Sequence, residues 1–212
     1  MERVLAVMCL ILVLSGCEKV VDADAIQLRN GLVYLPNSTA PFTGKVKDQY
    51  ANGQFKYEKT YKNGELGGLT RTWYENGQLE QEFITKNGMM ADGPYRKWHE
   101  NGQLESEAIF KNGKFSGVLR IWHENGQLKL ESIYKNGEVD GLTRAWYENG
   151  QLGEEYISKN GETDGPYRIW HENGQMKEKG TYKNGKFSGV LRKWHENGRL
   201  ELESIYKNGE KQ

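Results

Sequence analysis

The chain has little of what most enzymes and small secreted domains depend on. It contains only two cysteines in 212 residues, Cys9 and Cys17, and both lie near the N-terminus. No disulfide framework or cysteine-based zinc site is therefore available further along the chain. The 29 basic and 29 acidic residues cancel, which removes the excess of positive charge that nucleic-acid binding requires. Hydrophobic residues make up 36% of the chain, too few to fill a thick two-layer core.

A long hydrophobic run is also missing. The apolar segment from Val4 to Leu14 has eleven residues. As a helix it would span about 16 Å, roughly half of the hydrocarbon core of a bilayer, so it is too short to cross one. Such a segment is typical of a signal peptide. It ends in Leu14-Ser15-Gly16-Cys17, which resembles the lipobox of bacterial lipoproteins.

The lipobox resemblance implies a signal peptide over residues 1–16, a lipid (palmitate) attached to Cys17, and a lipidated tether over residues 17–25. The expected location is the cell envelope, with the chain anchored to a membrane through its lipid. By the same resemblance, Glu18 rather than Asp after the cysteine favours the outer membrane if the cell has two membranes. The alternative is an uncleaved hydrophobic segment that carries a cysteine by chance.

What the sequence has in abundance is repetition. The tripeptide Lys-Asn-Gly occurs seven times, and counting residues 45–68 as a first, degenerate copy gives seven repeats over residues 45–212. A block of three repeats is itself duplicated, since Leu69-Thr70-Arg71 returns as Leu142-Thr143-Arg144. Tryptophan recurs after one step of 25 residues and then four steps of 24: Trp73, Trp98, Trp122, Trp146, Trp170 and Trp194.

The dipeptide Asn-Gly occurs fifteen times, between segments rich in β-forming residues. Asn and Gly both tolerate positive φ, which a type I′ turn requires at its two central positions. The pattern predicts an all-β fold, an elongated twisted antiparallel meander of tandem 24-residue β-hairpins with about 14 strands. Neighbouring hairpins must stack, because one repeat alone buries too little apolar surface to fold.

The strand register can be predicted from the turns. If Asn76 and Gly77 are the two turn residues, Arg71 faces Glu82 across the hairpin, and opposite charges so placed stabilise a strand pair. One hairpin instead sets Arg168 against Lys179. The same arithmetic pairs Arg96 with Glu107, Arg120 with Glu131, Arg144 with Glu155, and Arg192 with Glu203.

A further regularity concerns the aromatic residue near each Lys-Asn-Gly turn. In two repeats it moves by two positions, to Phe83 and Tyr156, while Thr85 and Ser158 take its usual place. A shift of two residues keeps a side chain on the same face of a strand. The sequence therefore predicts one face that is kept aromatic.

These features resemble the MORN repeat, in the bacterial form of the YwqK-type putative antitoxin family. The matching elements are Trp-Tyr/His-Glu-Asn-Gly-Gln-Leu, the Lys-Asn-Gly turn and the glycine four residues after it, such as Gly68. The resemblance also implies that residues 26–44 form an N-terminal hairpin that caps the first sheet edge. Leu follows the first Asn-Gly turn where eukaryotic MORN repeats have Tyr, so their lipid binding is not carried over.

No catalytic, cofactor or metal site is predicted, and we expect a protein that is not an enzyme. The four histidines form a column, but Tyr74 and Tyr147 occupy equivalent positions, so the position requires a flat amphipathic ring. Equivalent residues in consecutive repeats should lie about 9.6 Å apart, too far for two imidazoles to share a zinc ion. The glutamates recur with the repeat and are assigned arginine partners.

Two surfaces remain as candidates for binding. The lysines of the Lys-Asn-Gly turns form a row along one long edge, where they could contact anionic lipid or serve solubility. The six tryptophans form a column that either is buried by curvature of the sheet or lines a groove for a partner.

The leading hypothesis is a membrane-anchored scaffold that binds a protein or peptide, with possible self-association through a sheet face or edge. The rivals are a toxin-neutralising or immunity protein of the envelope and a peripheral lipid- or cell-wall-binding structural protein.

Overall fold

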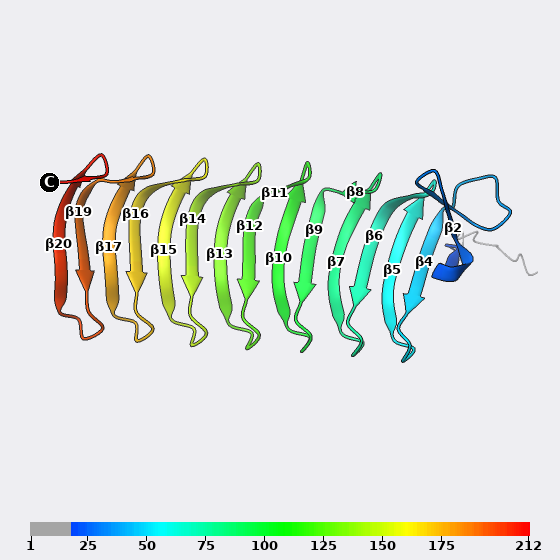
Figure 1. Ribbon diagram of the computed structural model, residues 1–212, viewed down its shortest axis with the longest axis horizontal. Helices are drawn as coiled ribbons and strands as arrows, with labels where there is room; N and C mark the ends of the chain where they lie inside the picture. The colour runs from blue at the N-terminus through cyan, green and yellow to red at the C-terminus, as the bar shows by residue number, and fades with distance from the viewer. Residues whose placement is uncertain (1–17) are drawn as a thin grey trace, which may run out of the picture.

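The computed structural model describes residues 18–212, which form one long sheet of successive hairpins (Figure 1). A single 3-10 turn, η1 (Ala23–Ala25), is the only helical element in the described part of the chain. No helix among the described residues is long and apolar enough to span a bilayer. The strands are β1 (Val20–Asp22), β2 (Gln27–Arg29), β3 (Leu32–Tyr34), β4 (Gly44–Gln49), β5 (Phe55–Lys62), β6 (Glu65–Trp73), β7 (Leu79–Lys86), β8 (Met89–Met90), β9 (Gly93–Trp98), β10 (Leu104–Lys111), β11 (Lys114–Phe115), β12 (Gly117–Trp122), β13 (Leu128–Lys135), β14 (Glu138–Trp146), β15 (Leu152–Lys159), β16 (Glu162–Trp170), β17 (Met176–Lys183), β18 (Lys186–Phe187), β19 (Gly189–Trp194), β20 (Leu200–Lys207) and β21 (Glu210–Lys211).

The predicted antiparallel meander is confirmed. The short strands β8, β11 and β18 continue after a break as β9, β12 and β19, respectively. The two parts of each interrupted strand pair with the same preceding strand. The seventeen labels from β4 to β20 therefore describe fourteen long strands. The sheet has nineteen labelled strands because β1 and β21 add a short strand at each end. Figure 1 shows the two kinds of turn on opposite long edges.

The two kinds of turn have different geometries. At the Lys-Asn-Gly turns both central residues have positive φ, 51° at Asn63 and 81° at Gly64, as a type I′ turn requires. At the Glu-Asn-Gly turns only the glycine does, with 84° at Gly77. There the Gly77 amide donates to the Tyr74 carbonyl at 2.9 Å, which defines a three-residue loop with a bulge.

The prediction of a type I′ turn at the Glu-Asn-Gly positions is thus wrong. The Asn76 side chain accepts a hydrogen bond from the Gln78 amide at 2.9 Å, and this local ring holds the asparagine out of the left-handed region. As a consequence the register shifts between Thr72 and Trp73, so that Trp73 faces Leu79. The predicted pairs further from the turn hold, including Arg71 with Glu82.

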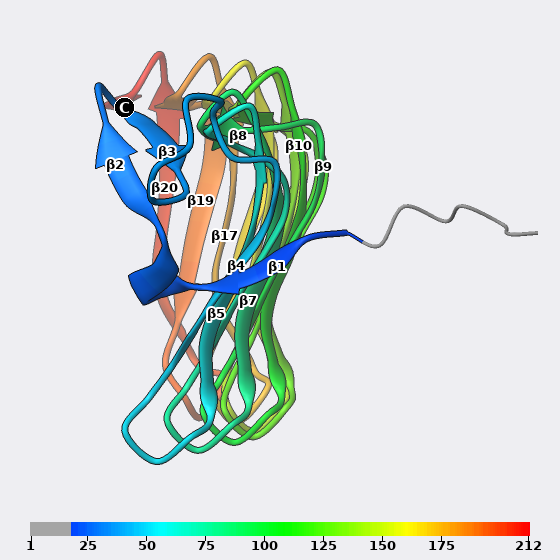
Figure 2. The same ribbon diagram turned by 90° about the vertical axis from the view of Figure 1, so that its right-hand side faces the viewer.

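The sheet is curved (Figure 2), and its two faces differ in the burial of their side chains. The face that bears the aromatic residues near the Lys-Asn-Gly turns holds most of the buried side chains, such as Thr70, Ala108 and Leu191. Val33 and Phe42 of the N-terminal segment form a buried cluster with Val46 of β4, and Tyr57 and Tyr61 of this face pack against it. Because the N-terminal segment lies on the hollow side in Figure 2, we call this the concave face and the opposite one the convex face.

The aromatic face predicted from the sequence is the concave face. The Phe83 ring lies 6.3 Å from that of Tyr95, which lies 6.0 Å from Phe110, so the displaced ring of one repeat meets the regular ring of the next. A second cluster joins Tyr167, Tyr182 and Phe187. Burial raises the pKa of the Tyr167 hydroxyl, as expected where rings crowd on the inner side of a curved sheet.

The N-terminal segment closes the first end of the sheet in two parts. The edge of β4 is covered by β1, which pairs with it in parallel and comes from residues expected to form a tether. The β2–β3 hairpin, expected to cap this edge, lies instead on the first Lys-Asn-Gly turn. There the Val33 amide donates to the Gly64 carbonyl at 2.9 Å, and the Gly64 amide donates to the Phe42 carbonyl at 2.7 Å.

Candidate functional site

The six tryptophans lie in one row on the convex face. Each is the last residue of its strand and is partly buried. Trp73 lies on the same side as Arg71, and its ring is 5.7 Å from that of Phe55. Across each bulge the row pairs with a second apolar row: Leu79, Leu104, Leu128, Leu152, Met176 and Leu200. The curvature of the sheet therefore does not bury the tryptophans, because they lie on its outer side.

The column of tyrosine and histidine residues joins each repeat to the next. The Tyr74 hydroxyl donates to the Trp98 carbonyl at 2.8 Å, and His123 Nε2 lies 3.0 Å from the Trp146 carbonyl. The carbonyl can only accept, so the histidine carries its proton on Nε2 and acts as the tyrosine hydroxyl does. This shared role explains why either residue type can occupy the position. No group of three His, Cys, Asp or Glu within residues 18–212 could hold a metal ion.

A second inter-repeat contact comes from the turn asparagines. In the hairpin of Asn125 the side-chain oxygen accepts from the Gln127 amide at 3.0 Å, and Nδ2 donates to the Glu148 carbonyl of the next repeat at 2.7 Å. The same pair of bonds occurs from Asn52 to Asn173. In the last repeat Asn197 makes only the local bond, to the Arg199 amide, among the described residues.

These asparagines provide a test of how the repeats are coupled. We expect Asn125→Ala to lower the free energy of unfolding by about 1–2 kcal/mol, because it removes a local bond and an inter-repeat bond. Asn197→Ala removes only the local bond and should cost about half as much. Urea unfolding followed by tryptophan fluorescence measures both. Equal losses would show that the bond to the next repeat contributes nothing.

The middle of the convex face carries a ladder of alternating arginine and glutamate. All five predicted pairs stand in register, and neighbouring hairpins are bridged as well. Glu155 accepts from Arg144 Nε at 2.9 Å within its hairpin and from Arg168 Nη1 at 2.7 Å across to the next. The hydrogen bond from Arg144 is the main cause that lowers the pKa of Glu155.

The ladder has one defect, since Lys179 lies opposite both Arg168 and Arg192. We expect Lys179→Glu to raise the free energy of unfolding by about 1 kcal/mol, because it replaces two like-charge contacts by two opposite-charge ones on a partly exposed face. Lys179→Gln, which only removes the repulsion, should give a smaller gain. The difference should shrink at 1 M salt. A destabilised Lys179→Glu would contradict the assigned pairing.

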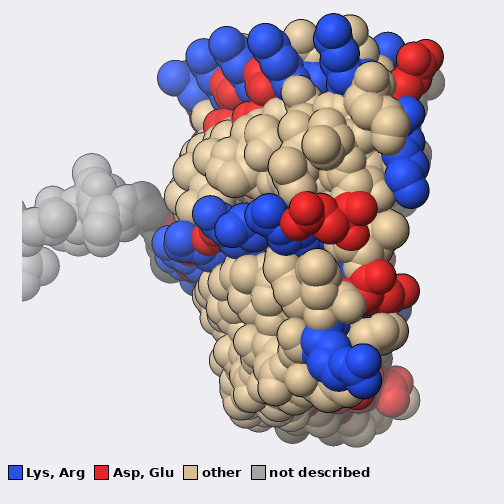
Figure 3. Space-filling view, turned by 90° about the vertical axis from the view of Figure 1, so that its left-hand side faces the viewer, with Lys and Arg blue, Asp and Glu red and all other residues tan. Residues whose placement is uncertain are grey.

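A third row on the convex face consists of exposed aliphatic side chains on the far side of the ladder. Their exposed fractions lie between 37% and 57%, high for such residues: Ile109, Val118, Ile133, Ile157, Val190 and Ile205. Figure 3 shows the outcome, a line of charged side chains that runs between two uncharged bands. The convex face thus presents apolar surface on both sides of a charged strip along the length of the sheet.

Two further predictions concern Cys17 and the lysines of the Lys-Asn-Gly turns. Cys17, the predicted site of lipid attachment, lies outside the described residues, as does the predicted signal peptide. The lysines of the Lys-Asn-Gly turns form an exposed row along one edge, as predicted. This row is interrupted by acidic residues, one of which, Asp140, lies 3.8 Å from Lys135.

One feature of the concave face was missed by sequence reasoning. A hollow lies beside Tyr147, Gly153 and Glu154, where the regular pattern of side chains is interrupted. The signal in the sequence was Gly153, which stands where the other repeats have Glu80, Glu105, Lys129, Lys177 and Glu201. Glu154 cannot be told from the other repeated glutamates by its position in the sequence alone.

Together, the repeating hairpins, the contacts from each repeat to the next and the two unlike faces define a linear repeat protein, in which each unit is stabilised by its neighbours. The MORN repeat variant family matches the chain over six segments: residues 42–63, 66–87, 91–112, 116–136, 163–184 and 188–208. The chain therefore belongs to the MORN repeat variant family. Residues 137–162, which lie between two of these segments, form hairpins with the same register. No curated protein matches the chain.

Proposed function

We propose that this MORN-repeat chain is a non-enzymatic scaffold of the bacterial envelope, anchored by a lipid on Cys17, that binds a protein or peptide with its convex face. The observation that carries the binding role is the pair of apolar rows on that face, with aliphatic exposure of up to 57% at Ile205. Contiguous exposed apolar surface that is bordered by charge is typical of protein interaction sites.

The architecture supports this role in a second way. The rows repeat with each hairpin, so that an elongated partner would meet the same combination of tryptophan, charge and aliphatic side chain at every step. Aromatic residues are frequent anchors in interfaces, and the partly buried tryptophans are held in place by their neighbours before a partner arrives. Membership of a family of repeat scaffolds agrees with a role without catalysis.

The binding role is tested by exposing the full chain carrying Cys17→Ser to envelope extract with a crosslinker. We expect one recurring protein on the unaltered convex face and its loss from the double variant Ile133→Glu/Ile157→Glu. The matched control is Met89→Glu, which changes a 70% exposed apolar residue at the Lys-Asn-Gly edge and should leave capture unchanged. Capture of the same protein by all three forms would count against the convex face.

The lipid anchor requires its own measurement. Labelling cells with palmitate should mark the unaltered chain and not Cys17→Ser, and fractionation should move the variant out of the membrane fraction. If both forms carry no label and fractionate alike, the proposed anchor is wrong. That result would leave the binding role to be judged by the crosslinking experiment alone.

A further inference from the structure

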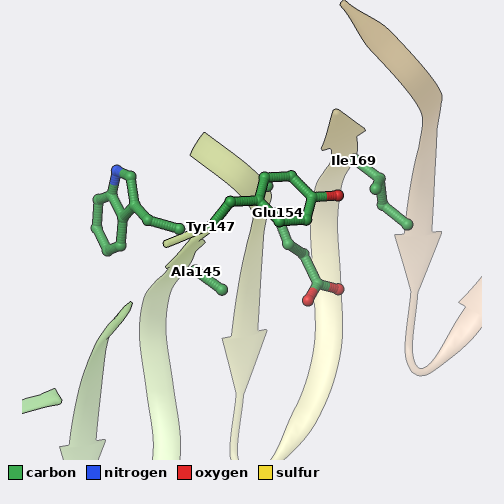
Figure 4. Close-up of a pocket in the computed structure, with 6 residues that line it drawn as sticks. Ala145, Tyr147, Glu154 and Ile169 are labelled. Carbon is green, nitrogen blue, oxygen red and sulfur yellow. The ribbon is translucent and has the colours of Figure 1, made fainter. Parts of the chain in front are cut away.

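A hollow of about 220 Å³ interrupts the concave face between β14, β15 and β16 (Figure 4). The hollow is lined by Ala145, Trp146, Tyr147, Gly153, Glu154 and Ile169. In Figure 4 the Tyr147 ring extends over Glu154 toward Ile169 on the next strand. The Tyr147 hydroxyl donates to the Trp170 carbonyl at 2.8 Å, so the ring is fixed at both ends.

Glu154 is the unusual group in this hollow. Its cross-strand neighbours are Ala145 on one side and Ile169 on the other, and no cation of the described chain lies within 4.0 Å of its carboxylate. Two other carboxylates on this face are neutralised within the chain, Glu105 by Lys97 at 2.8 Å and Glu178 by Lys193 at 2.8 Å. A third, Glu80, accepts a hydrogen bond from the Thr72 hydroxyl at 2.8 Å. Burial without a counter-charge raises the pKa of Glu154.

The duplicated block shows what is missing. Three repeats earlier, Tyr74 occupies the place of Tyr147, and Lys97 occupies the place of Ile169. Lys97 lies close enough to Tyr74 to oppose the rise in the pKa of that hydroxyl. In the first block the chain therefore supplies its own ammonium group beside the tyrosine. In the second block the lysine is replaced by isoleucine, while a carboxylate, Glu154, stands where the first block has Gln81.

Glycine at position 153 keeps the hollow open. A Cβ atom there would lie 2.9 Å from the Tyr147 ring, so any larger residue would push the ring away. The ring is thus held against the backbone, beside the unpaired carboxylate. A partly buried aromatic ring with an adjacent anion favours a cation through both charge and cation–π attraction. The chain has an internal example of the second contact, with Lys59 Nζ 4.1 Å from the centroid of the Tyr57 ring.

We propose that this hollow binds a lysine side chain of a partner, with its ammonium group between the Glu154 carboxylate and the Tyr147 ring and its methylene stem against Ala145 and Ile169. The charge of Glu154 and the apolar walls select a cation carried on an aliphatic stem. Trp146 borders the hollow, but the side chains of Ala145, Glu154 and Ile169 lie on the face opposite the tryptophan row. The lysine site therefore goes beyond the function proposed above, and either can fail without the other.

The test uses the full chain carrying Cys17→Ser in detergent micelles, with isoleucine methyl groups labelled for NMR. The probe is Nα-acetyl-lysine amide, and the comparison probe is the Nα,Nζ-diacetyl form, which lacks the charge. We expect a saturable shift of the Ile169 methyl signal with the first probe and none with the second. Glu154→Gln should weaken binding roughly tenfold, the usual effect of losing a charge-assisted hydrogen bond.

Glu105→Gln is the matched control, because its carboxylate already has a lysine partner within the chain. It should bind the probe as the unaltered protein does, and circular dichroism shows whether each variant keeps its sheet. Equal binding of the charged and uncharged probes would overturn the proposal. So would equal binding by a folded Glu154→Gln variant, or the absence of any saturable shift. Tighter binding of Nα-acetyl-arginine amide would overturn the choice of lysine.

Discussion

Replacing Gly64 by alanine is expected to release the N-terminal hairpin from the sheet and to lower the free energy of unfolding by about 3 kcal/mol. Gly64 has φ +81°, a conformation that costs alanine about 1–2 kcal/mol. The added Cβ would also lie 2.9 Å from Leu32 Cβ and 3.0 Å from Pro41 Cβ, so the hairpin must move or the turn must distort. Hydrogen exchange of the Val33 amide, which donates to the Gly64 carbonyl, should accelerate sharply.

Gly161 provides the control for this substitution. It occupies the equivalent turn position with the same φ of +81°, and a Cβ there would meet nothing within 4 Å. Gly161→Ala should therefore cost only the conformational part, about 1–2 kcal/mol, and leave exchange at Val33 unchanged. If the two variants lose the same stability, the hairpin makes no energetically important contact with the first turn.

Replacing Glu155 by lysine should destabilise the sheet by about 2 kcal/mol. The substitution removes two ion pairs, to Arg144 and Arg168, and places a third cation between them. Because Lys179 and Arg192 follow on the next strands, five cations would then stand in a row. Solvent weakens these ion pairs, because the arginine side chains are about 40% exposed. Urea unfolding at low and high salt measures the effect, which salt should reduce.

Glu155→Gln keeps the size of the side chain and separates lost attraction from added repulsion. It should cost about 1 kcal/mol. In acid the unaltered protein should lose the same amount of free energy of unfolding, because Glu155 then becomes protonated. Since the pKa of Glu155 is lowered in the folded chain, its contribution is complete above the ordinary value of 4.5 and disappears as the pH falls through the lower folded value. A cost for Glu155→Gln that does not vanish at low pH would contradict the ion-pair account.

Much of this fold could be predicted from sequence because the repeat fixes the turns, and the turns fix the register. Arg71 lies opposite Glu82, as expected. A shift of one residue would move every side chain of the strand to the other face, so the register is strongly specified. The error at Asn76 had a local cause. Asn-Gly suits either a type I′ turn or a three-residue loop, and the choice depends on a side-chain bond to Gln78 and on the carbonyl of the next repeat, neither of which the dipeptide reveals.

The faces were harder to predict than the strands. Whether the tryptophans are buried by curvature or line a groove could not be predicted, because the alternation of side chains says which residues share a face and not which way a sheet bends. The hollow at Glu154 was hidden for a related reason. Neither position 145 nor position 169 supplies a cation that could pair with Glu154. Both positions lie on other strands and become neighbours of Glu154 only through the pairing in the sheet.

The duplicated block has a consequence for how the molecule presents itself to others. Three repeats occupy six strands, so equivalent surface features recur at a separation of about 29 Å. A two-headed partner able to reach that far would gain avidity without any additional contact. The exchange of Lys97 for Ile169 makes the two halves chemically distinct, so that an asymmetric ligand could distinguish one half from the other.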